Sequence, residues 1–221
     1  MGRLDEIASH LVGEDLVADV GCDHGYIAEK LLQVGGAKKV VLTDISEKCL
    51  KKAQTLLAKE LENGKATAVV CDGLKGVDLP ITAVVIAGMG GEEIIKILTE
   101  CLPRLPIKKL VLQPMKNAEK LRQFLVDGQF SPYRDYTFYD ANKYYDLIYA
   151  VKSDNPVKPY TEDELIFGRE NLAVKGKDFI LRYSREIEKL TAVLSSENLT
   201  TKAKDELITK IKKYKSVIGE P

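Results

Sequence analysis

The chain has 221 residues, of which 45% are hydrophobic and 30% are charged, so it is long enough for one α/β domain of about 150 residues and a smaller second part. Its 33 lysine and arginine residues equal its 33 aspartate and glutamate residues in number, which excludes a bulk positive field that would draw the whole chain onto nucleic acid or an anionic membrane. Any nucleic-acid contact must therefore come from a local patch.

The N-terminus and the cysteines indicate a cellular compartment. The first residues, "MGRLDEIASH", contain no apolar signal segment, and Glu6 stands where a myristoylation motif needs serine or threonine. The cysteines, Cys22, Cys49, Cys71 and Cys101, form no Cys-x-x-Cys pair and lie beside or within predicted strands and helices. We therefore expect small buried thiols in a reducing cytosol, with no metal site and no membrane segment. The oligomeric state stays open, with a monomer favoured.

Strand-like apolar runs alternate with helical patterns, which is typical of a parallel sheet wrapped by helices. Strands are predicted at about 16–21, 39–44, 66–71, 81–87 and 108–113, and helices at about 25–35, 46–63, 90–102 and 117–127. Two aromatic-rich stretches then alternate in polarity, "FSPYRDYTFYD" and "KYYDLIYAVK", with a turn around Ala141 and Asn142, so an antiparallel hairpin is predicted. Dinucleotide dehydrogenases usually continue with another βα unit, whereas class I methyltransferases end in such a hairpin. The predicted fold class is therefore α/β, with a Rossmann-like class I methyltransferase sheet.

A second, helical domain is predicted after the proline-punctuated segment "SDNPVKPY". We place the domains at residues 1–155 and 156–221, and Thr161 with Glu164 fits a capping box that opens the first helix. Apolar residues then recur at intervals of three and four on both sides of the polar turn "SSENLTT", which predicts an antiparallel coiled-coil hairpin. These residues are Ile180, Tyr183, Ile187, Leu190 and Leu194 before the turn and Ala203, Leu207, Ile211, Tyr214 and Ile218 after it.

The stretch "VADVGCDHGY" combines a strand, a polar turn and a helix start. This geometry points backbone N–H groups and a helix N-terminus at a ligand above the strand. The glycines Gly21 and Gly25 do not complete the G-x-G-x-x-G spacing, which argues against a pyrophosphate cradle. The carboxylates of Asp19 and Asp23 suit instead a ligand with a positive sulfonium and an amino-acid tail. The plainer alternative is an ordinary turn in which Asp23 caps the helix.

Two more predicted strands end in aspartate. The second ends in "VVLTDIS", where Asp44, with Ile45 beside it, can accept both hydroxyls of a ribose, although an aspartate before Ser46 is more often a helix cap. The third ends in "VVCDGL", where Asp72 would accept from the exocyclic amine of an adenine and Gly73 would let the backbone approach its ring. Three strand-end aspartates on consecutive βα units together predict S-adenosylmethionine as the cofactor.

The fourth and fifth predicted strands end in turns that would form the mouth of the site. The fourth ends in "VIAGMGGEEI", where the glycine-rich run from Gly88 to Gly91 permits a flat ring to lie against the backbone, or serves only a tight turn. The Asn/Asp-Pro-Pro-aromatic motif of many methyltransferases acting on exocyclic amines of bases is absent here. The fifth ends in "LVLQPMKNAEKL", where Gln113 can hydrogen-bond a base edge, Pro114 stiffens the turn and Asn117 caps a helix.

Taken in order, several of these motifs resemble the bacterial TrmK family, whose members methylate N1 of adenosine 22 in the D-arm of tRNA. The motifs are "RLDEIASHL", "ADVGCDHGY", "TDIS", "CDGL", "IAGMGG" and "LQP", followed by a helical hairpin. The resemblance covers essentially the whole chain, and the pairing of "DHGY" with "AGMGG" is more specific than general methyltransferase motifs. Cys22 and Gly25 depart from the Ser and Ala expected beside Asp-His, but both are small. The resemblance implies an S-adenosylmethionine-dependent tRNA (adenine-N1)-methyltransferase whose partner is tRNA.

The resemblance also implies which residues form the site. It assigns Gly21, Asp23, His24, Asp44, Ile45, Asp72, Gly73 and Gly88 to the cofactor pocket, and Met89, Gly90, Gly91, Gln113 and Pro114 to its mouth. Adenine N1 already carries a lone pair, so catalysis consists mainly of positioning, with Asp23 stabilising the transferring charge and Gln113 holding the base edge. His24 is interpreted as a hydrogen-bonding or cofactor-contacting residue rather than a proton shuttle, and His10 as exposed and structural.

Three other functions stay open at this point. A small-molecule methyltransferase is favoured by the neutral net charge, which falls short of the basic signature of a nucleic-acid binder. An NAD-dependent oxidoreductase is disfavoured by the terminal hairpin, and a non-catalytic methyltransferase-like binding module by the intact set of aspartates. The helical domain carries cations such as Lys202, Lys204, Lys212 and Lys213, so we expect it to hold tRNA, or else only to pack or dimerise.

Overall fold

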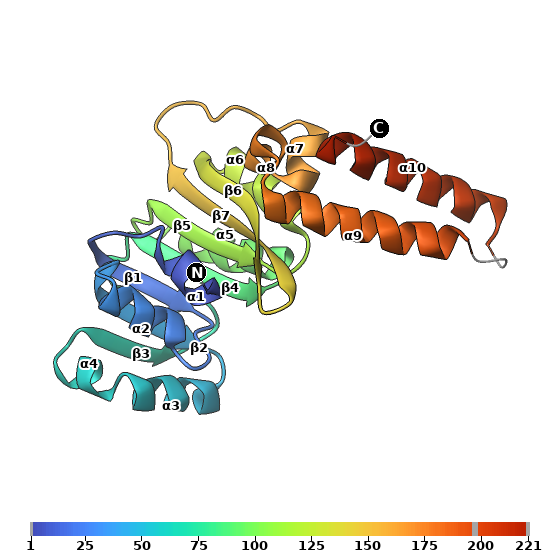
Figure 1. The fold of residues 1–221 in the computed structure, drawn as a ribbon. Helices are drawn as coiled ribbons and strands as arrows, with labels where there is room; N and C mark the ends of the chain where they lie inside the picture. The colour runs from blue at the N-terminus through green and yellow to red at the C-terminus, as the bar shows by residue number, and fades with distance from the viewer. Residues whose placement is uncertain (1, 196–198, 220–221) are drawn as a thin grey trace.

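The computed structural model describes residues 2–195 and 199–219, which form a sheet domain and a projecting pair of helices (Figure 1). The strands are β1 (Glu14–Val20), β2 (Ala37–Asp44), β3 (Ala66–Val70), β4 (Ala83–Met89), β5 (Lys109–Pro114), β6 (Phe130–Asp140) and β7 (Lys143–Lys152). They form one sheet in the order β3-β2-β1-β4-β5-β7-β6, in which β7 is antiparallel to both of its neighbours and the other pairs are parallel. The predicted fold class and all seven predicted strands are confirmed.

The helices cover both faces of this sheet and form the projection. They are α1 (Arg3–Ala8), α2 (Tyr26–Gln33), α3 (Glu47–Leu56), α4 (Ala58–Glu62), α5 (Gly91–Cys101), α6 (Ala118–Asp127), α7 (Glu162–Phe167), α8 (Arg169–Val174), α9 (Lys177–Leu194) and α10 (Thr201–Ile218). The single helix predicted over residues 46–63 is wrong, because the chain leaves helical geometry at Leu57, whose side chain stays buried while α4 continues toward β3. Within the described residues, no helix is long and apolar enough to cross a membrane.

Strand direction determines where a ligand can bind. Because β1 to β5 run parallel, their carboxyl ends meet at one edge of the sheet, and the turns that follow them lie there together. The chain order reverses on either side of β1, which has β2 on one side and β4 on the other. Open α/β sheets bind their ligands in the crevice at such a switch point.

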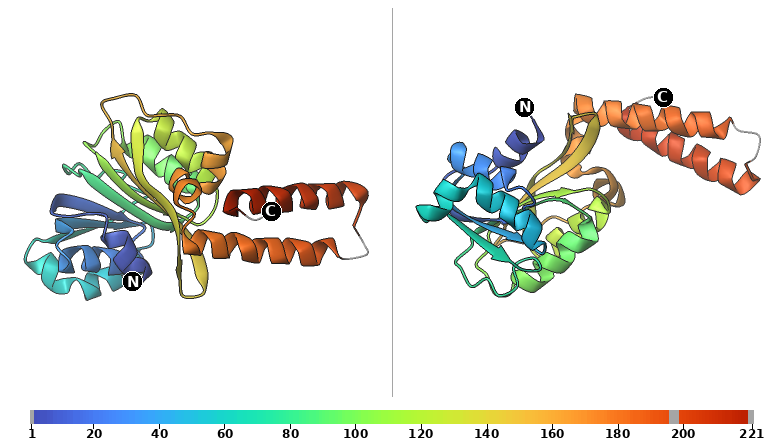
Figure 2. Two further views of the ribbon diagram at one scale, coloured as in Figure 1. Left: turned by 45° about the horizontal axis from the view of Figure 1, so that its top comes forward. Right: turned by 90° about the horizontal axis from the view of Figure 1, so that it is seen from below.

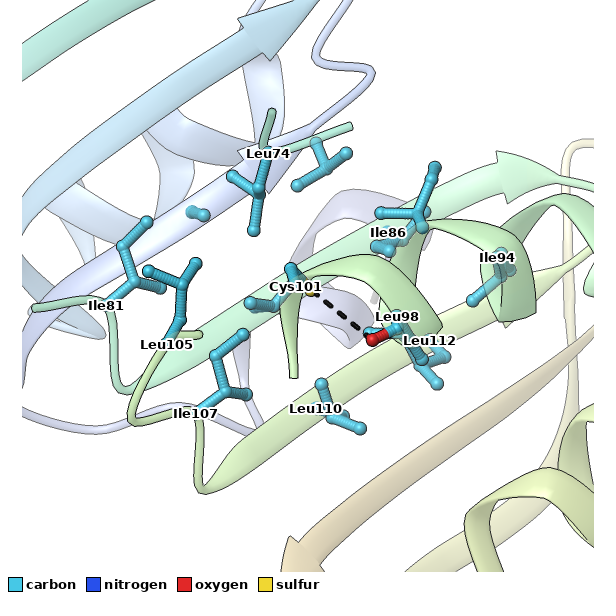
Figure 3. Packing of buried hydrophobic residues seen from close by; sticks show 14 of the residues in the cluster. Leu74, Ile81, Ile86, Ile94, Leu98, Cys101, Leu105, Ile107, Leu110 and Leu112 are labelled. Carbon is cyan, nitrogen blue, oxygen red and sulfur yellow. Dashed lines mark hydrogen bonds between the residues drawn. The ribbon is translucent and has the colours of Figure 1, made fainter. Parts of the chain in front are cut away.

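The core consists of a cluster of apolar side chains on each face of the sheet. Figure 3 shows the cluster beneath α5, where Leu98 and Cys101 pack with Ile86, Leu110 and Leu112. Strands buried on both faces need nearly continuous apolar sequence, and the runs in β4 and β5 have it. These clusters hold the strand ends in fixed positions.

The four cysteines are all free thiols, but only two are buried. Cys22 and Cys101 are buried as expected, and burial raises the pKa of the Cys101 thiol to about 11. The expectation is wrong for Cys49, in the first turn of α3, and for Cys71, which follows the end of β3, because both are only partly buried. In the part of the chain that the structure describes, no three His, Cys, Asp or Glu side chains are grouped to hold a metal.

The predicted hairpin is formed by β6 and β7. Its turn residues Ala141 and Asn142 both have positive φ, at 45° and 65°, and a two-residue turn with this backbone matches the twist of paired strands. Aromatic side chains pair across the two strands near the tip, where the rings of Tyr139 and Tyr144 are 4.9 Å apart. The hairpin tip lies beside the start of α9 (Figures 1 and 2).

The helices α9 and α10 pack side by side and project away from the sheet domain, as Figure 2 shows; we call this pair the arm. The capping box of Thr161 and Glu164 is present at α7. Among the residues predicted to line the arm, Tyr183, Ile187 and Ile218 are buried, and Tyr183 packs edge-on against Phe167. Of the predicted turn "SSENLTT", Ser195 is the C-cap of α9 and Thr200 the N-cap of α10, while residues 196–198 lie outside the described residues.

A buried arginine joins α7, which precedes the arm, to the sheet domain. Arg122 in α6 is fully buried; its Nε donates to Asp135 Oδ1 at 2.9 Å, and its Nη1 donates to the carbonyl of Leu165 at 2.9 Å and of Ile166 at 3.2 Å. The same aspartate accepts from the backbone N–H of Arg169 at 3.2 Å. Segment 160–169 therefore shares buried polar contacts with the sheet domain, although the predicted boundary lies before it.

Candidate functional site

The first turn, between β1 and α2, is tied to the neighbouring strand. The N–H groups of Gly21 and Cys22 donate to the carbonyl of Thr43 at 2.8 and 3.0 Å. Gly25, the N-cap of α2, has φ 77°, and a Cβ there would lie 2.9 Å from the Cβ of Ala53 in α3. This close approach explains the glycine. The N-cap residue Gly25 has no side chain to cap α2. Because Asp19 accepts only from the N–H of Ala28, the N–H groups of Tyr26 and Ile27 remain available to an anionic ligand group.

Asp19 lies beneath this turn rather than in it. Its carboxylate is 1% exposed and accepts from the backbone N–H of Ala28 at 3.1 Å. The expectation that Asp19 faces the positive end of a ligand is therefore wrong, because the side chain points into the protein and holds the first turn of α2. Burial, with a smaller effect from nearby Asp44, raises the pKa of the Asp19 carboxyl to about 7.

The raised pKa of Asp19 predicts a stability change with pH. In the unfolded chain the Asp19 carboxyl has the ordinary aspartate pKa of about 3.9. The folded protein therefore binds the carboxyl proton of Asp19 more tightly than the unfolded chain does. The Asp19 contribution to the free energy of unfolding is therefore largest below about pH 4 and is lost as the pH rises through about 7. Asp19→Asn, which keeps an oxygen for the N–H of Ala28, should remove this loss.

Urea unfolding of both proteins between pH 4 and pH 8 measures the effect. We expect the stability of the wild type, relative to Asp19→Asn, to fall up to about pH 7 and then level off. A difference that does not change with pH would show that Asp19 titrates as an ordinary aspartate.

Asp44 connects the first and second turns. Its Oδ2 accepts from the N–H of Asp23 at 3.1 Å and its Oδ1 from the N–H of Ser46 at 2.8 Å. Ser46 is itself the N-cap of α3, so Asp44 is not the helix cap that the sequence also allowed. A carboxylate has about four lone-pair sites, which leaves acceptor capacity for further donors. The neighbouring Ile45 is 75% exposed and offers an apolar surface beside it.

Asp23 and His24 form the exposed part of the first turn. Asp23 adopts a left-handed conformation with φ 48°, and its Oδ2 lies 2.8 Å from His24 Nδ1. This hydrogen bond is the main reason that the pKa of Asp23 is lowered, so the carboxylate is ionised at neutral pH. The ring of His24 stacks flat on Tyr26, with centroids 5.4 Å apart. The alternative in which Asp23 caps α2 is wrong, because its side chain is held by His24.

The third turn carries Asp72 and Gly73. Asp72 is engaged by two lysines, with Lys75 Nζ at 2.9 Å and Lys96 Nζ at 3.8 Å, and the hydrogen bond from Lys75 is the main cause of its lowered pKa. The backbone of this turn is close to the second, since the N–H of Cys71 donates to the carbonyl of Asp44 at 3.1 Å. An adenine contact by Asp72 stays a prediction, and it requires the carboxylate to share its lysine partners.

The turn after β4 packs closely against the first and fifth turns. A Cβ on Gly21 would lie 2.1 Å from Cε of Met89, so the end of β4 reaches over the first turn. A Cβ on Gly91 would lie 2.3 Å from the carbonyl oxygen of Asn117, which brings the fourth and fifth turns together. Gly90 similarly faces Lys116. Backbone packing between the turns therefore accounts for Gly91, and a φ of 69° accounts for Gly21, whereas Gly90 meets only a flexible lysine side chain. Contact of this turn with a flat ring stays a prediction.

Asn117 begins α6 in a different way from the one predicted. It is the N-cap residue, but its side chain makes no capping hydrogen bond. Its left-handed backbone, with φ 56°, turns the chain into the helix instead, which asparagine tolerates better than most residues.

Arg3, which was not predicted as a site residue, covers the predicted base-binding residue. Gln113 is fully buried, and its Oε1 accepts from Arg3 Nε at 2.9 Å while its Nε2 donates to the carbonyl of Pro114 at 3.2 Å. The Arg3 guanidinium also lies 5.3 Å from the ring centroid of Tyr145. A base can reach Gln113 only if Arg3 moves aside. Arg3 opens the motif "RLDEIASHL", but nothing in that stretch indicates a contact with Gln113, because Arg3 lies in the N-terminal helix, far from any strand end.

His10 is partly buried, so the expectation that it is exposed is wrong. Its Nε2 lies 2.9 Å from the hydroxyl of Tyr136, and its ring stacks on Tyr149 with centroids 5.6 Å apart. Burial is the main cause of its lowered pKa. Because these partners belong to the hairpin, His10 serves to fix α1 against the sheet, which agrees with a structural role.

The arrangement as a whole suits a positively charged nucleoside with an amino-acid tail. The exposed carboxylate of Asp23 and the half-exposed one of Asp44 lie at the switch point of the sheet, beside the uncapped N-terminus of α2. Carboxylates can accept from a ribose and stabilise a cation, while helix N–H groups bind an anion. The carboxylates and the helix N–H groups therefore fit the charged groups and the ribose of S-adenosylmethionine.

Comparison with known proteins agrees with this chemistry. The family model described as TrmK, tRNA (adenine(22)-N(1))-methyltransferase, matches residues 17–216. A Mycoplasma pneumoniae protein named as a candidate tRNA methyltransferase is 32% identical over 166 residues, which cover 75% of this chain and 76% of that protein. The structure of M. capricolum TrmK with S-adenosylhomocysteine is 25% identical, with a TM-score of 0.85 over 98% of this chain and 96% of that one. A Streptococcus pneumoniae structure with S-adenosylmethionine, described as a candidate tRNA (m1A22) methyltransferase, has the same identity and TM-score over 98% of both chains.

Proposed function

This chain belongs to the TrmK family of S-adenosylmethionine-dependent tRNA (adenine(22)-N(1))-methyltransferases, and we propose that its strand-end turns are where it performs that reaction. The observation that carries the proposal is the Asp44 carboxylate, which joins the first and second turns at the switch point of the sheet. We further propose that the enzyme works in the cytoplasm as a monomer. The alternatives of an oxidoreductase, a small-molecule methyltransferase and a binding module have no comparable support.

Four features would hold the cofactor. The free lone pairs of Asp44 would accept the ribose hydroxyls, and the exposed Ile45 would lie against the adenine. The uncapped N-terminus of α2 would bind the carboxylate of the methionine end, with Asp23 near its positive groups. When bound, S-adenosylmethionine supplies a methyl group on a positively charged sulfur.

In methyl transfer, the residues of the chain would act by position and charge. Adenine N1 needs no base to become a nucleophile, so the protein has to hold it about 3 Å from the methyl carbon and in line with the sulfur. Positive charge moves from the sulfur to the base during the step. The Asp23 carboxylate, kept ionised by His24, would stabilise that charge in both places without taking a proton.

The mouth of the site would open by movement of Arg3. The target base must leave its stack in the tRNA, at a cost of a few kcal/mol, and enter between the turns that begin at Gly88 and Pro114. Gln113 could then hold the base edge once Arg3 releases its Oε1. After it leaves Gln113, the Arg3 guanidinium would still have the face of the Tyr145 ring as a partner.

A nucleoside assay tests the proposed function directly. Unmodified tRNA is incubated with the enzyme and methyl-labelled S-adenosylmethionine, digested, and examined for N1-methyladenosine. The matched control is the same tRNA with guanosine at position 22. Equal labelling of both RNAs would contradict the assignment of position 22, and no labelling of either would contradict the proposed function.

The arm is proposed to hold tRNA through its free cations. Lys202, Lys204 and Lys212 are exposed and form no ion pair within residues 2–195 and 199–219, whereas Lys213 pairs with Asp163 at 2.8 Å and belongs to the joint with α7. Replacing the first three with alanine should lower the slope of log affinity against log salt, by up to about 0.9 for each phosphate that the variant no longer neutralises.

Filter binding of tRNA measures this slope. The salt concentration is varied from about 50 to about 200 mM, because phosphate contacts change the affinity strongly over that range. Calorimetry with S-adenosylmethionine is the control, and cofactor affinity should not change. An unaltered slope in the triple variant would favour an arm that only packs or dimerises.

A further inference from the structure

A pocket of about 420 Å³ lies between the hairpin tip and α9, and the proposed chemistry does not use it. We call it the hairpin–arm pocket. Its walls include four cations, Lys143, Arg182, Arg185 and Lys189, and two tyrosines, Tyr144 and Tyr145. Figure 1 shows how β6 and β7 extend to meet α9 at this place. Because the chain has no net charge, four cations around one pocket form a local positive patch.

Two of the four cations are already committed to carboxylates. Arg182 donates to Asp146 at 2.8 Å, and Lys189 pairs with Glu186, the acidic residue of the pocket wall, at 2.7 Å. Arg185 and Lys143 are exposed, and neither forms an ion pair in the described part of the chain. The pocket therefore has two cations available for an anionic ligand.

The available arginine lies against aromatic rings. The Arg185 guanidinium is 5.6 Å from the ring centroid of Tyr139 and 5.4 Å from that of Tyr144. Arginine combines a fork of donors for phosphate with a plane that stacks. Grooves that bind single-stranded nucleic acid use the same combination, with cations along the backbone and aromatic faces for the bases.

The pocket adjoins the mouth of the catalytic site. Tyr145 lines the pocket and also lies under Arg3, at 5.3 Å from its guanidinium. Met115 lines it as well, and its sulfur is 3.4 Å from Nε2 of Gln113. A strand of RNA that leaves the mouth toward the arm would therefore pass over this pocket.

We propose that the hairpin–arm pocket binds a nucleotide of the substrate RNA next to the target adenosine, with its phosphate on Arg185 and Lys143 and its base on the ring of Tyr144. The proposal rests on the proposed function, because it takes RNA as the substrate. It goes further by assigning the flanking nucleotide to a site between the hairpin and the arm, in addition to the cations farther along the arm.

Two substitutions separate the phosphate contact from the stacking contact. Arg185→Ala should raise the KM for tRNA about tenfold and lower the salt slope of tRNA binding by about one, with kcat at saturating tRNA changed by less than about twofold. Tyr144→Ala should weaken tRNA binding about tenfold without changing the slope, because a stacked base releases no counterions. Tyr144→Phe should bind as the wild type does.

The control is Lys59→Ala, which removes one exposed cation from α4 at the opposite edge of the sheet. Calorimetry with S-adenosylmethionine and thermal unfolding show whether each variant keeps its cofactor site and its fold. Arg185→Lys, which keeps the charge and loses the stacking plane, should retain the slope and lose part of the affinity.

The pocket proposal is overturned if Arg185→Ala and Tyr144→Ala both match Lys59→Ala in tRNA affinity, salt slope and KM. Failure of the proposed function gives a different result, because the wild-type enzyme would then leave adenosine 22 unmethylated whatever the variants do.

Discussion

Replacing Asp44 with alanine should weaken S-adenosylmethionine binding by about 10²- to 10⁴-fold. Hydrogen bonds to a charged acceptor contribute about 1.5–3 kcal/mol each, and two ribose hydroxyls would lose theirs, for about 3–6 kcal/mol, with tenfold in affinity for each 1.4 kcal/mol. The N–H groups of Asp23 and Ser46 would also lose their acceptor. The first turn would then lose its connection to the second.

Isothermal titration calorimetry measures the change. Ser46→Ala is the matched control. It removes the Ser46 Oγ, which accepts from the N–H of Cys49 at 3.2 Å and caps α3, and it leaves the Asp44 carboxylate in place. Asp44→Asn, with one acceptor oxygen remaining, should lie between the wild type and the alanine variant. Unchanged affinity in Asp44→Ala would remove the ribose assignment.

Replacing Asp23 with alanine should lower kcat by about 10²-fold or more, by analogy with the loss of one preorganised electrostatic group. The fold should be retained, because the carboxylate is exposed and its hydrogen bond to His24 lies at the surface, with a cost of about 1 kcal/mol for alanine in the left-handed conformation. The Asp23 N–H would still donate to Asp44. Asp23 therefore allows charge to be removed from the turn without removing its backbone contacts.

Single-turnover methylation at saturating S-adenosylmethionine and tRNA gives the rate of the chemical step. His24→Ala is the informative companion, because it leaves the carboxylate but removes the partner that orients it, and we expect a smaller loss than in Asp23→Ala. Full kcat in Asp23→Ala would leave Asp23 a role in cofactor binding alone.

Features that depend on local sequence could be predicted well. Each strand of the sheet has its own apolar run, and the turn of the hairpin has its own residues, Ala141 and Asn142. Asp44 could be placed at the edge of the sheet because parallel strands bring their carboxyl ends together. The capping box of α7 likewise involves residues only three positions apart, Thr161 and Glu164.

Features that depend on contacts distant in sequence could not be predicted. Arg3 covers Gln113 from 110 positions away, and nothing around either residue indicates the other. The direction of the Asp19 side chain could not be predicted either, because an aspartate next to a turn can point to the ligand or to the helix behind it. Asp72 looks free in sequence, yet Lys75 and Lys96 occupy its carboxylate.

The Arg122 joint has a consequence for which RNAs can be substrates. The helix α9 has 18 residues, so the arm extends about 27 Å at 1.5 Å per residue. To pivot, α9 would have to break the hydrogen bond from Arg182 to Asp146 at 2.8 Å. The helix α7, which packs against the arm through Phe167, would also have to leave the buried guanidinium of Arg122, and together these losses cost several kcal/mol. If the arm holds tRNA as proposed, a substrate RNA must present an adenosine and a distant stretch of backbone at a fixed separation. On that proposal, we expect a short oligonucleotide that carries the adenosine but does not reach the arm to be a poor substrate.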